Sequence, residues 1–427
     1  TGLCEYGIRL PMAIIGIISL YVFYYLIKSI FDNKRMALIS VAFFAICPWH
    51  IMKSRWGMEC NIFPDIILLS TLLFVLGLKK KKTSLQILAF IGFAISSYSY
   101  GTGYLFLPVY ILGMLGYLIY KKEITIKKSI IYLLIMFVIC IPIILYIAIN
   151  TFGLNQISIG KVTIPKLLVN RYDEVSTVFS GNIIENCVDN LLATLRILIL
   201  QTDGLEWNAI SQFGMFYIIS IIFFIIGVKE SLEKYKDNIY NQIMNIWMLA
   251  AIVLSAFCDA NINRINIIMI PCIYYIVVGI YEFLNKYKVA TLCLGTIYIV
   301  LFAEFMYVYT SKDYNEYYTF TSGVEGVVDY CNSLDEDTVY CQYSFKEPFI
   351  YFMFYGETDV HEYLDTVQYY EESRTFDNIK SFGKYKFYLP SEIKENSVII
   401  VQKDTEKYYD EVCKNKVTIN QFDIYEF

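Results

Sequence analysis

The sequence has very little histidine and little charge of any kind. Of its 427 residues only two are histidine and 18% are charged, whereas 57% are hydrophobic. Two histidines exclude a metal site built from a histidine cluster and disfavour a Ser-His-Asp triad. The mean hydropathy of +0.48 is typical of a polytopic membrane protein.

The sequence also gives little indication of disulfide bonds or of a secretory leader. Eleven cysteines is an odd number, and Cys140, Cys272 and others lie inside apolar runs, where they serve as small apolar side chains. A pairing of Cys331 with Cys341 stays open, because connectivity cannot be read from a sequence. No signal peptide is recognisable and the chain opens on Thr1, so we expect a further segment before it.

Ten apolar runs occupy the first three quarters of the chain, each near the ~20 residues that cross a bilayer as a helix. They are 7–31, 36–50, 61–78, 85–98, 103–120, 128–149, 212–228, 240–257, 264–284 and 289–309. The second and fourth runs are short, which suits helices that are buried in a bundle or bent at its edge. The pattern predicts a polytopic α-helical membrane protein with about ten spans.

Charge is distributed unevenly along the chain. Residues 1–310 contain 24 Lys and Arg against 17 Asp and Glu, and residues 311–427 contain 11 against 23. Alternate loops hold 15 of the 24 cations, and the positive-inside rule puts those loops in the cytoplasm of a plasma-membrane protein. The remaining loops and the acidic tail then face outward. Such an acidic tail disfavours nucleic acid as a partner.

The outward stretch from Cys47 to Cys60 concentrates ionisable groups between two apolar runs. It contains His50, Lys53, Arg55 and Glu59, and ionisable groups at a membrane boundary tend to mark function. Pro48 is expected to end the incoming helix. A helical interpretation of the next segment places Arg55 and Glu59 on one face, four residues apart. Alternatively, the two cations only reach toward lipid headgroups.

The outer loop from 150 to 211 contains a second apolar segment. Residues 191–200 are too short to span a bilayer and suit an interfacial or re-entrant helix. A polar turn at 201–208 follows, which contains Asp203, Trp207 and Asn208. It could equally be an ordinary glycine turn with an interfacial tryptophan anchor.

Residues 311–427 are predicted to form a separate, extracytoplasmic α/β domain behind a transmembrane domain at 1–310. Strands are expected at 338–342, 385–389, 397–402 and 417–425. Helices are expected at 324–334 and 348–355, the second with Pro348 in its first turn.

Several short motifs follow one another on the outward side. They are Arg9-Leu10-Pro11, Pro48-Trp49-His50, Ser54-Arg55 with Glu59, Ser97-Tyr98-Ser99-Tyr100 before Pro108, the turn Asp203 to Asn208, and Asn261-Ile262-Asn263-Arg264 with Pro271. In this order they resemble the glycosyltransferase superfamily C, specifically relatives of the protein O-mannosyltransferases and the lipid A aminoarabinose transferases. The resemblance covers most of residues 5–284.

The resemblance implies transfer of a hexosyl or pentosyl group from a polyprenyl-phosphate carrier on the outer side of the membrane. The acceptor is left open between a protein, a glycolipid and a wall polymer, and a divalent cation is compatible with the pattern. In the family an acidic catalytic residue lies in an outer loop ahead of the Arg-Leu-Pro segment. That residue cannot be carried onto any position here, because the chain begins inside or just after that loop.

The residues themselves suggest roles in such a transfer, which needs cations for the departing phosphate and a carboxylate for the acceptor proton. Arg55 and Arg264 are the main phosphate candidates, because guanidinium donates two parallel hydrogen bonds. Glu59 could orient Arg55, which is the role we favour, bind a sugar hydroxyl or act as a base. Asp203 is the other candidate base. Further substrate contacts are expected from Lys53, Arg9, His50, Tyr100, Asn263, Trp207 and Asn208.

Two other classes of protein remain open. A lipid-linked oligosaccharide polymerase or ligase would share the carrier and the basic outer loops, but has no need of a folded acidic tail. A polysaccharide transporter should show inverted repeats and broken helices near the midplane. The sequence contains no such repeat, and its polar candidates cluster at the outer boundary.

Overall fold

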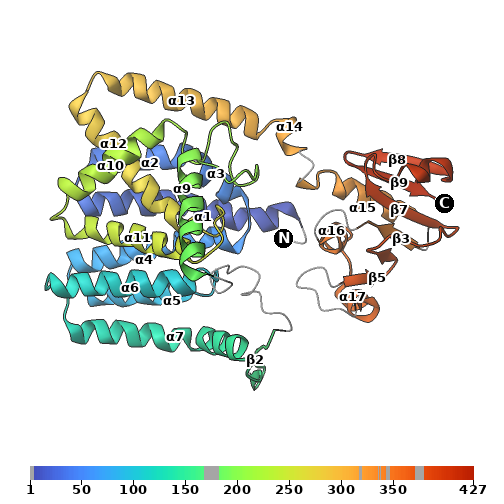
Figure 1. The fold of residues 1–427 in the computed structure, drawn as a ribbon, viewed down its shortest axis with the longest axis horizontal. Coiled ribbons are helices and arrows are strands. Elements are labelled where there is room, and N and C mark those ends of the chain that lie inside the picture. The colour runs from blue at the N-terminus through green and yellow to red at the C-terminus, as the bar shows by residue number, and fades with distance from the viewer. Residues whose placement is uncertain are drawn as a thin grey trace. The chain divides into compact units, whose positions relative to one another are not determined.

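A computed structural model describes residues 4–167, 182–316, 320–334, 336, 338–342, 347–370 and 379–427. Its internal contacts divide the chain into two compact units. One unit, residues 8–305, contains helices and a short hairpin in its described parts. The other joins residues 306–427 with 1–7 and carries a mixed sheet (Figure 1).

The helical unit is built mainly from long apolar helices. They are α1 (Glu5–Phe31), α2 (Lys34–Ile46), α3 (Pro48–Arg55), α4 (Glu59–Lys79), α5 (Thr83–Ser96), α6 (Gly103–Tyr120), α7 (Ile126–Phe152), α9 (Ile183–Leu200), α10 (Ser220–Glu233), α11 (Ile239–Ala256), η1 (Asn266–Ile268), α12 (Met269–Lys286) and α13 (Ala290–Tyr309). The hairpin β1 (Ile157–Ile159) and β2 (Val162–Ile164) follows α7.

Seven of these helices are long and apolar enough to cross a membrane, taking η1 with α12 as one span. The number rises to eight if the bent pair α2 and α3 is a single span. The other two predicted runs form the shorter helices α5 and α10, so the expected count of ten is not confirmed. The protein is a multi-pass membrane protein.

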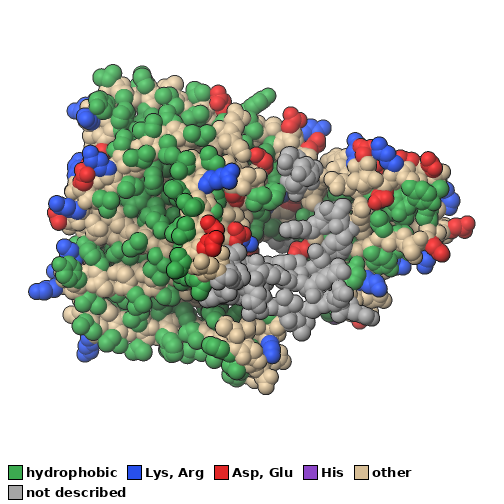
Figure 2. Space-filling view, viewed as in Figure 1, with side chains coloured by type: hydrophobic (Ala, Val, Ile, Leu, Met, Phe, Trp, Pro, Cys, Tyr) green, Lys and Arg blue, Asp and Glu red, His purple; other side chains and the backbone are tan. Residues whose placement is uncertain are grey.

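Charged side chains are rare on the flank of the helical unit that Figure 2 shows, which is covered by apolar side chains. Lys and Arg gather at the end of the unit where the α6–α7 and α12–α13 loops lie (Figures 1 and 2). Helix α7 follows the same pattern, because most of its long apolar run is not buried within the protein. Such a surface fits contact with lipid chains.

The break between α2 and α3 confirms the role predicted for Pro48. Cys47 is extended, with φ −67° and ψ 123°, and Pro48 is the first residue of α3. A proline is tolerated there because its missing N–H would have no helical partner. The two helices are bent by 57°.

The prediction of one continuous helix from Arg55 to Glu59 is wrong. Helix α3 ends at Arg55, Trp56 and Met58 are extended, and α4 begins at Glu59. Arg55 and Glu59 therefore do not form an i,i+4 pair on one helix. The interruption stands at the junction of two helices and exposes both side chains.

Helices α10 and α12 approach each other unusually closely through two glycines. A Cβ atom on Gly227 would lie 1.8 Å from the Tyr275 carbonyl oxygen, and one on Gly279 would lie 1.9 Å from that of Phe223. Only hydrogen fits at either position. Small residues at such crossings let helix backbones meet inside a membrane.

Helix α9 is longer than the predicted apolar segment and runs across the direction of the neighbouring long helices (Figure 1). Asn182 caps it by accepting a hydrogen bond from the Ile184 N–H. Asn190 donates to the Ala256 carbonyl at the end of α11. The side chains that face away are apolar and exposed, among them Ile184, Val188, Leu192, Leu195 and Ile199.

The second unit contains a seven-stranded sheet in the order β4-β5-β6-β3-β7-β9-β8. Its strands are β3 (Thr338–Cys341), β4 (Gln368–Tyr369), β5 (Ile379–Phe382), β6 (Tyr385–Lys386), β7 (Ser397–Gln402), β8 (Asn415–Ile419) and β9 (Phe422–Glu426), with helices α14 (Lys312–Asn315), α15 (Val324–Ser333), α16 (Pro348–Tyr355), α17 (Val360–Thr366) and η3 (Lys407–Glu411). Strand β3 pairs in parallel with β6 and β7, and the other pairs are antiparallel.

Most of the predicted elements of this unit are present. Helices α15 and α16 and strands β3 and β7 lie where they were expected, and Pro348 opens α16. The strand predicted at 417–425 is wrong, because it is a hairpin of β8 and β9 that turns at Asn420 with φ 49°. Asparagine accepts this left-handed conformation more readily than other residues do.

Two further features of the second unit bear on its stability. The thiols of Cys331 and Cys341 are buried and free, in one apolar cluster between the sheet and helices α15 and α16. On β8, the Lys416 ammonium lies 2.7 Å from Asp410 Oδ1 and 3.2 Å from Asp423 Oδ2. These contacts cross-link the hairpin to the segment before it.

Candidate functional site

Lys53 forms a buried ion pair with Asp65 on α4. Its Nζ lies 2.6 Å from both carboxylate oxygens, and the two side chains are 2% and 5% exposed. The same Nζ lies 4.8 Å from the centre of the Trp49 ring. Lys53 therefore does not reach toward lipid headgroups, and its charge is balanced inside the helical unit.

A chain of amide hydrogen bonds connects α3, the start of α4 and η1. Trp49 Nε1 donates to Asn266 Oδ1 over 2.9 Å, and Asn266 Nδ2 donates to the Cys60 carbonyl and to Asn61 Oδ1, each over 3.1 Å. Asn61 Nδ2 in turn donates to the Trp56 carbonyl over 3.0 Å. Asn61 and Asn266 are each 2% exposed, and such buried amides require these partners.

His50 is also buried, and it faces α1. Its Nε2 lies 3.1 Å from the Ser19 hydroxyl and 3.2 Å from the Gly16 carbonyl oxygen. Gly16 permits the close packing of α1 against α3, because a Cβ atom there would stand 2.3 Å from Ser54 Oγ. The predicted residue thus lies where α1 packs against α3.

Arg264 forms hydrogen bonds with other residues of its own loop. Its Nη1 donates to the Asp259 carboxylate over 2.5 Å and to the Asp259 carbonyl over 3.2 Å. Its backbone N–H donates to Asn261 Oδ1 over 2.9 Å. The Arg264 side chain is 24% exposed, so part of the guanidinium remains accessible.

Asp203 joins this loop to the polar turn after α9. Its Oδ1 accepts a hydrogen bond from the Leu205 N–H, and its Oδ2 accepts one from Asn208 Nδ2 and another from the Ile262 N–H. The last of these bonds spans 59 residues of chain. The turn is therefore more than a local glycine turn, although Asp203 does form the local bond typical of one.

The half-buried Tyr100 lies in the loop between α5 and α6. Burial raises the pKa of its hydroxyl, the Cys60 thiol and the Glu59 carboxylate add to that rise, and the Arg264 cation opposes it. Asn266, two residues after Arg264, also donates to the Cys60 carbonyl beside Glu59, so the start of α4 and the segment after Arg264 lie side by side.

The remaining candidates differ in burial and lie on several segments of the helical unit. Arg55 is exposed at the end of α3, and Arg9 is exposed near the start of α1. Asn263 and Trp207 are half-buried in the loop and the turn just described. No described contact joins Lys53 or His50 to the region around Tyr100.

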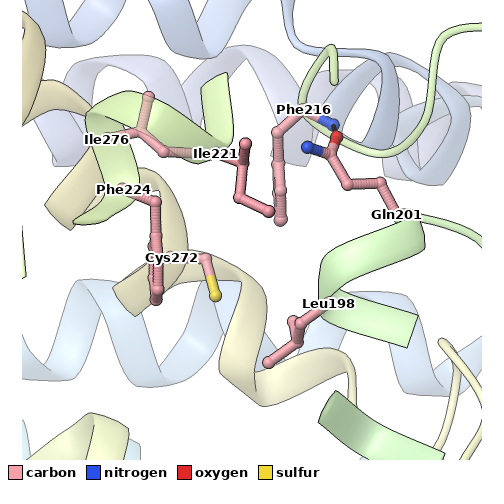
Figure 3. Close-up of a pocket in the computed structure, with 7 residues that line it drawn as sticks. All are labelled: Leu198, Gln201, Phe216, Ile221, Phe224, Cys272 and Ile276. Carbon is pink, nitrogen blue, oxygen red and sulfur yellow. Dashed lines mark hydrogen bonds between the residues drawn. The ribbon is translucent and has the colours of Figure 1, made fainter. Parts of the chain in front are cut away.

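A small apolar pocket lies between α9, α10 and α12 (Figure 3). Leu198 and Gln201 line it from the end of α9, and the rest of its wall consists of Phe216, Ile221, Phe224, Cys272 and Ile276. The Gln201 amide is held by its own bonds, since Oε1 accepts from the Phe216 N–H and Nε2 donates to the Tyr217 carbonyl. Within the described ranges, no group of three or more His, Cys, Asp or Glu side chains is arranged to hold a metal ion.

Sequence reasoning missed three residues that organise the site. Asp65 balances Lys53, and Asn61 and Asn266 carry the amide chain. A signal for Asp65 was present, because a single carboxylate in the apolar run 61–78 demands a partner. Asn61 and Asn266 gave no comparable signal, since they lie at helix starts, where polar residues are common.

Comparison with known proteins gives a family match for the first part of the chain. Residues 1–146 match the family model described as "Dolichyl-phosphate-mannose-protein mannosyltransferase". The resemblance to the glycosyltransferase superfamily C predicted from the motifs is thereby confirmed for that part. A comparison with the sequences of curated proteins finds no match.

Distant likenesses to solved structures extend over more of the chain. The Archaeoglobus fulgidus oligosaccharyltransferase complex with Zn and sulfate is 13% identical at a TM-score of 0.49, over 79% of this chain and 48% of that one. The oligosaccharyltransferase AglB from Archaeoglobus fulgidus, in complex with an inhibitory peptide and a dolichol-phosphate, is 12% identical at 0.46, over 80% and 51%. The chain spans about half the length of these two solved chains.

Proposed function

We propose that this chain is an integral-membrane glycosyltransferase, which moves a sugar from a polyprenyl-phosphate carrier to an acceptor hydroxyl outside the cytoplasm. The observation that carries the proposal is the amide chain through Asn266. Through Asn61, it connects the carbonyl of Trp56 with Asn266. Trp56 follows Arg55 directly, and Asn266 lies two positions after Arg264. Two outward arginines from distant parts of the sequence are thus held on adjoining segments.

In the proposed reaction, the acceptor oxygen attacks the anomeric carbon of the sugar and the bond from that carbon to the phosphate oxygen breaks. The lipid phosphate leaves with the electron pair of that bond. Arg55 and Arg264 donate hydrogen bonds to the phosphate as its charge grows, which is the electrostatic stabilisation that such a transition state requires. Arg264 keeps its contact with Asp259 through Nη1, and its remaining donors serve the phosphate.

The acceptor proton passes to a carboxylate, and we assign this role to Glu59. It is exposed at the first turn of α4, next to Cys60, whose carbonyl accepts a hydrogen bond from Asn266, two residues after Arg264. Asp203 is less suited, because both of its oxygens already accept hydrogen bonds from the fold. Lys53 and His50 belong to the scaffold in this proposal, since both are buried among protein partners.

The substrates follow from the description of the matching family, which names a dolichyl-phosphate mannose donor and a protein acceptor. We therefore propose a polyprenyl-phosphate hexose as the donor and a protein hydroxyl as the first acceptor to test. Glycolipid and wall-polymer acceptors are the alternatives to be compared with it in the same assay.

The test is sugar transfer by the purified chain in lipid, with Arg55→Ala, Arg264→Ala and the matching lysine variants. Each alanine variant should lose about 2–4 kcal/mol of transition-state stabilisation, as removal of an oxyanion donor does elsewhere. Lysine should restore only part of the rate, because it cannot form the planar two-bond contact. Rates within a few-fold of wild type in both alanine variants would remove the phosphate role.

We also propose that residues 311–427 face outward, which the distribution of cations supports. A cysteine introduced at exposed Lys403 should react with a membrane-impermeant thiol reagent in intact cells. The unaltered chain is the control for its native cysteines. Reaction only after lysis would reverse the assignment.

A further inference from the structure

The carboxylate of Asp203 makes a contact that no local turn requires. Two of its three hydrogen bonds stay within residues 203–208, but the third comes from the Ile262 backbone N–H over 3.0 Å. Ile262 is 2% exposed, so water does not compete easily for that N–H. Buried N–H groups are nearly always paired, and here Asp203 supplies the partner.

The loop that receives this contact is held rigidly from within. Asn261 accepts from the Arg264 N–H, and Asp259 accepts from the Arg264 guanidinium. Ile262 lies between these two closures, two residues before Arg264. An anchor on Ile262 therefore determines where the backbone of Arg264 stands relative to the turn after α9.

Asp203 also orients the amide of Asn208. A carboxylate only accepts, so the group that faces Asp203 Oδ2 over 2.7 Å must be Nδ2. Asn208 Oδ1 is then turned elsewhere, and it is a buried acceptor without a hydrogen-bond partner in the part of the chain that the structure describes. A buried acceptor of this kind calls for a donor, which a substrate hydroxyl can supply.

From these contacts we infer that Asp203 is a positioning residue for Arg264 and not the base of the reaction. The inference rests on the proposed function. Asp203 pins the 259–264 loop through Ile262, which holds the guanidinium of Arg264 at the departing phosphate. Its oxygens are engaged by three donors of the fold and do not receive the acceptor proton.

Replacement of Asp203 separates the two roles. Asp203→Asn keeps an oxygen that accepts hydrogen bonds from Ile262 and Asn208, but its amide cannot act as a base. Asp203→Ala removes both the hydrogen-bond acceptor and the base. We expect Asp203→Ala to lower the transfer rate by about 10²-fold, the effect of displacing a group near the reacting centre by roughly 1 Å. Asp203→Asn should stay within about tenfold of wild type, the value of one ordinary hydrogen bond.

Two further variants control this comparison. Asp189→Ala removes an exposed carboxylate from α9 and should leave the rate unchanged. Asn208→Ala removes one bond to Asp203 but leaves the Ile262 contact, so the amides of residues 259–264 should keep more of their exchange protection than in Asp203→Ala. An Asp203→Asn variant as inactive as Asp203→Ala would overturn the inference and restore Asp203 as a base.

A second measurement needs no turnover. Hydrogen exchange of the full chain in lipid should show that the amides of residues 259–264 lose protection in Asp203→Ala and keep it in Asp203→Asn. Unchanged protection in Asp203→Ala would also overturn the inference. If the wild type transfers no sugar from any donor, the proposed function fails, while exchange still decides whether Asp203 pins the loop.

A double variant tests whether Asp203 acts through Arg264. Once Arg264→Ala has removed the guanidinium, Asp203→Ala should produce no further loss of rate, because there is nothing left to position. Losses that multiply in the double variant would contradict the inference. They would mean that Asp203 contributes to the reaction independently of Arg264.

Discussion

The helical unit and the sheet unit use ion pairs in different ways. Lys53 and Asp65 in the helical unit are 2% and 5% exposed, whereas Lys416 and Asp410 in the sheet unit are 32% and 40% exposed. The buried pair has no access to water, so each charge depends on the other. Lys416 and Asp410 remain partly solvated, so their contact stabilises the fold less than a fully buried pair does.

This difference distinguishes the charged residues that stabilise the helical unit from those that are candidates for contact with a substrate. Lys53 and Asp65 satisfy one another inside the helical unit, and so they join α3 to α4. Arg55 and Glu59 flank the interruption that this pair secures, and both are exposed. In the helical unit, therefore, burial distinguishes the ionisable residues of the scaffold from those that a substrate can reach.

The largest effect is expected from removing one member of the buried pair. Lys53→Met leaves Asp65 as an unpaired buried carboxylate, which should lower the free energy of unfolding by about 3–5 kcal/mol. Thermal unfolding of the purified protein in detergent measures it. The double variant Lys53→Met with Asp65→Leu should recover most of the loss, because no charge is then left unpaired. A single variant as stable as the double one would remove the contrast between the two units.

A smaller loss is expected at the glycine contact of α10 and α12. Gly227→Ala forces a methyl group onto the Tyr275 carbonyl, and overpacking of this kind costs about 1–3 kcal/mol. Gly116→Ala on α6 is the matched control, since a Cβ atom there meets nothing within 4 Å. The same unfolding assay applies. Equal behaviour of the two variants would mean that α10 and α12 are not in such close contact.

The smallest effect is expected at Lys416 in the sheet unit. The Lys416 hydrogen bond lowers the pKa of Asp410. Burial opposes ionisation of Asp423, but hydrogen bonds from Thr418, the Asp404 N–H and Lys416 outweigh it, so that pKa is lowered too. Both carboxyl groups therefore stabilise the fold above the usual Asp pKa of about 3.9, and this stabilisation is lost as the pH falls below it.

Lys416→Met should thus change stability only slightly at neutral pH and should weaken the acid dependence of the β8–β9 hairpin. Hydrogen exchange of the hairpin in the full chain, corrected for intrinsic rates, follows both effects. A change at neutral pH as large as that of Lys53→Met would show that exposure does not distinguish the pairs.

Local patterns in the sequence predicted a good part of the fold. Pro48 indicated the bend, and short runs rich in β-branched residues located β3 and β7. Where prediction failed, a local pattern supported two structures equally well. The sequence of 417–425 is compatible with one long strand or with a hairpin. The left-handed backbone of Asn420 makes it a hairpin.

The site was less predictable, because it depends on contacts between distant residues. Arg264, Glu59 and Tyr100 were named from motifs, but nothing in the motifs shows that they lie together. Spacing along one helix suggested an Arg55–Glu59 pair, and the break at Trp56 removed it. The bond from Ile262 to Asp203 crosses 59 residues and uses a backbone N–H, which no side-chain pattern reports.

The central claim is that Arg55 and Arg264 hold one donor phosphate, and a double-variant cycle of sugar transfer in lipid tests it most directly. Rates are compared for wild type, Arg55→Ala, Arg264→Ala and the double variant, with a polyprenyl-phosphate sugar as the donor. If both side chains bind the same phosphate, the loss in the double variant departs from the product of the two single losses. Strictly multiplicative losses, or single variants as active as the wild type, would contradict the claim.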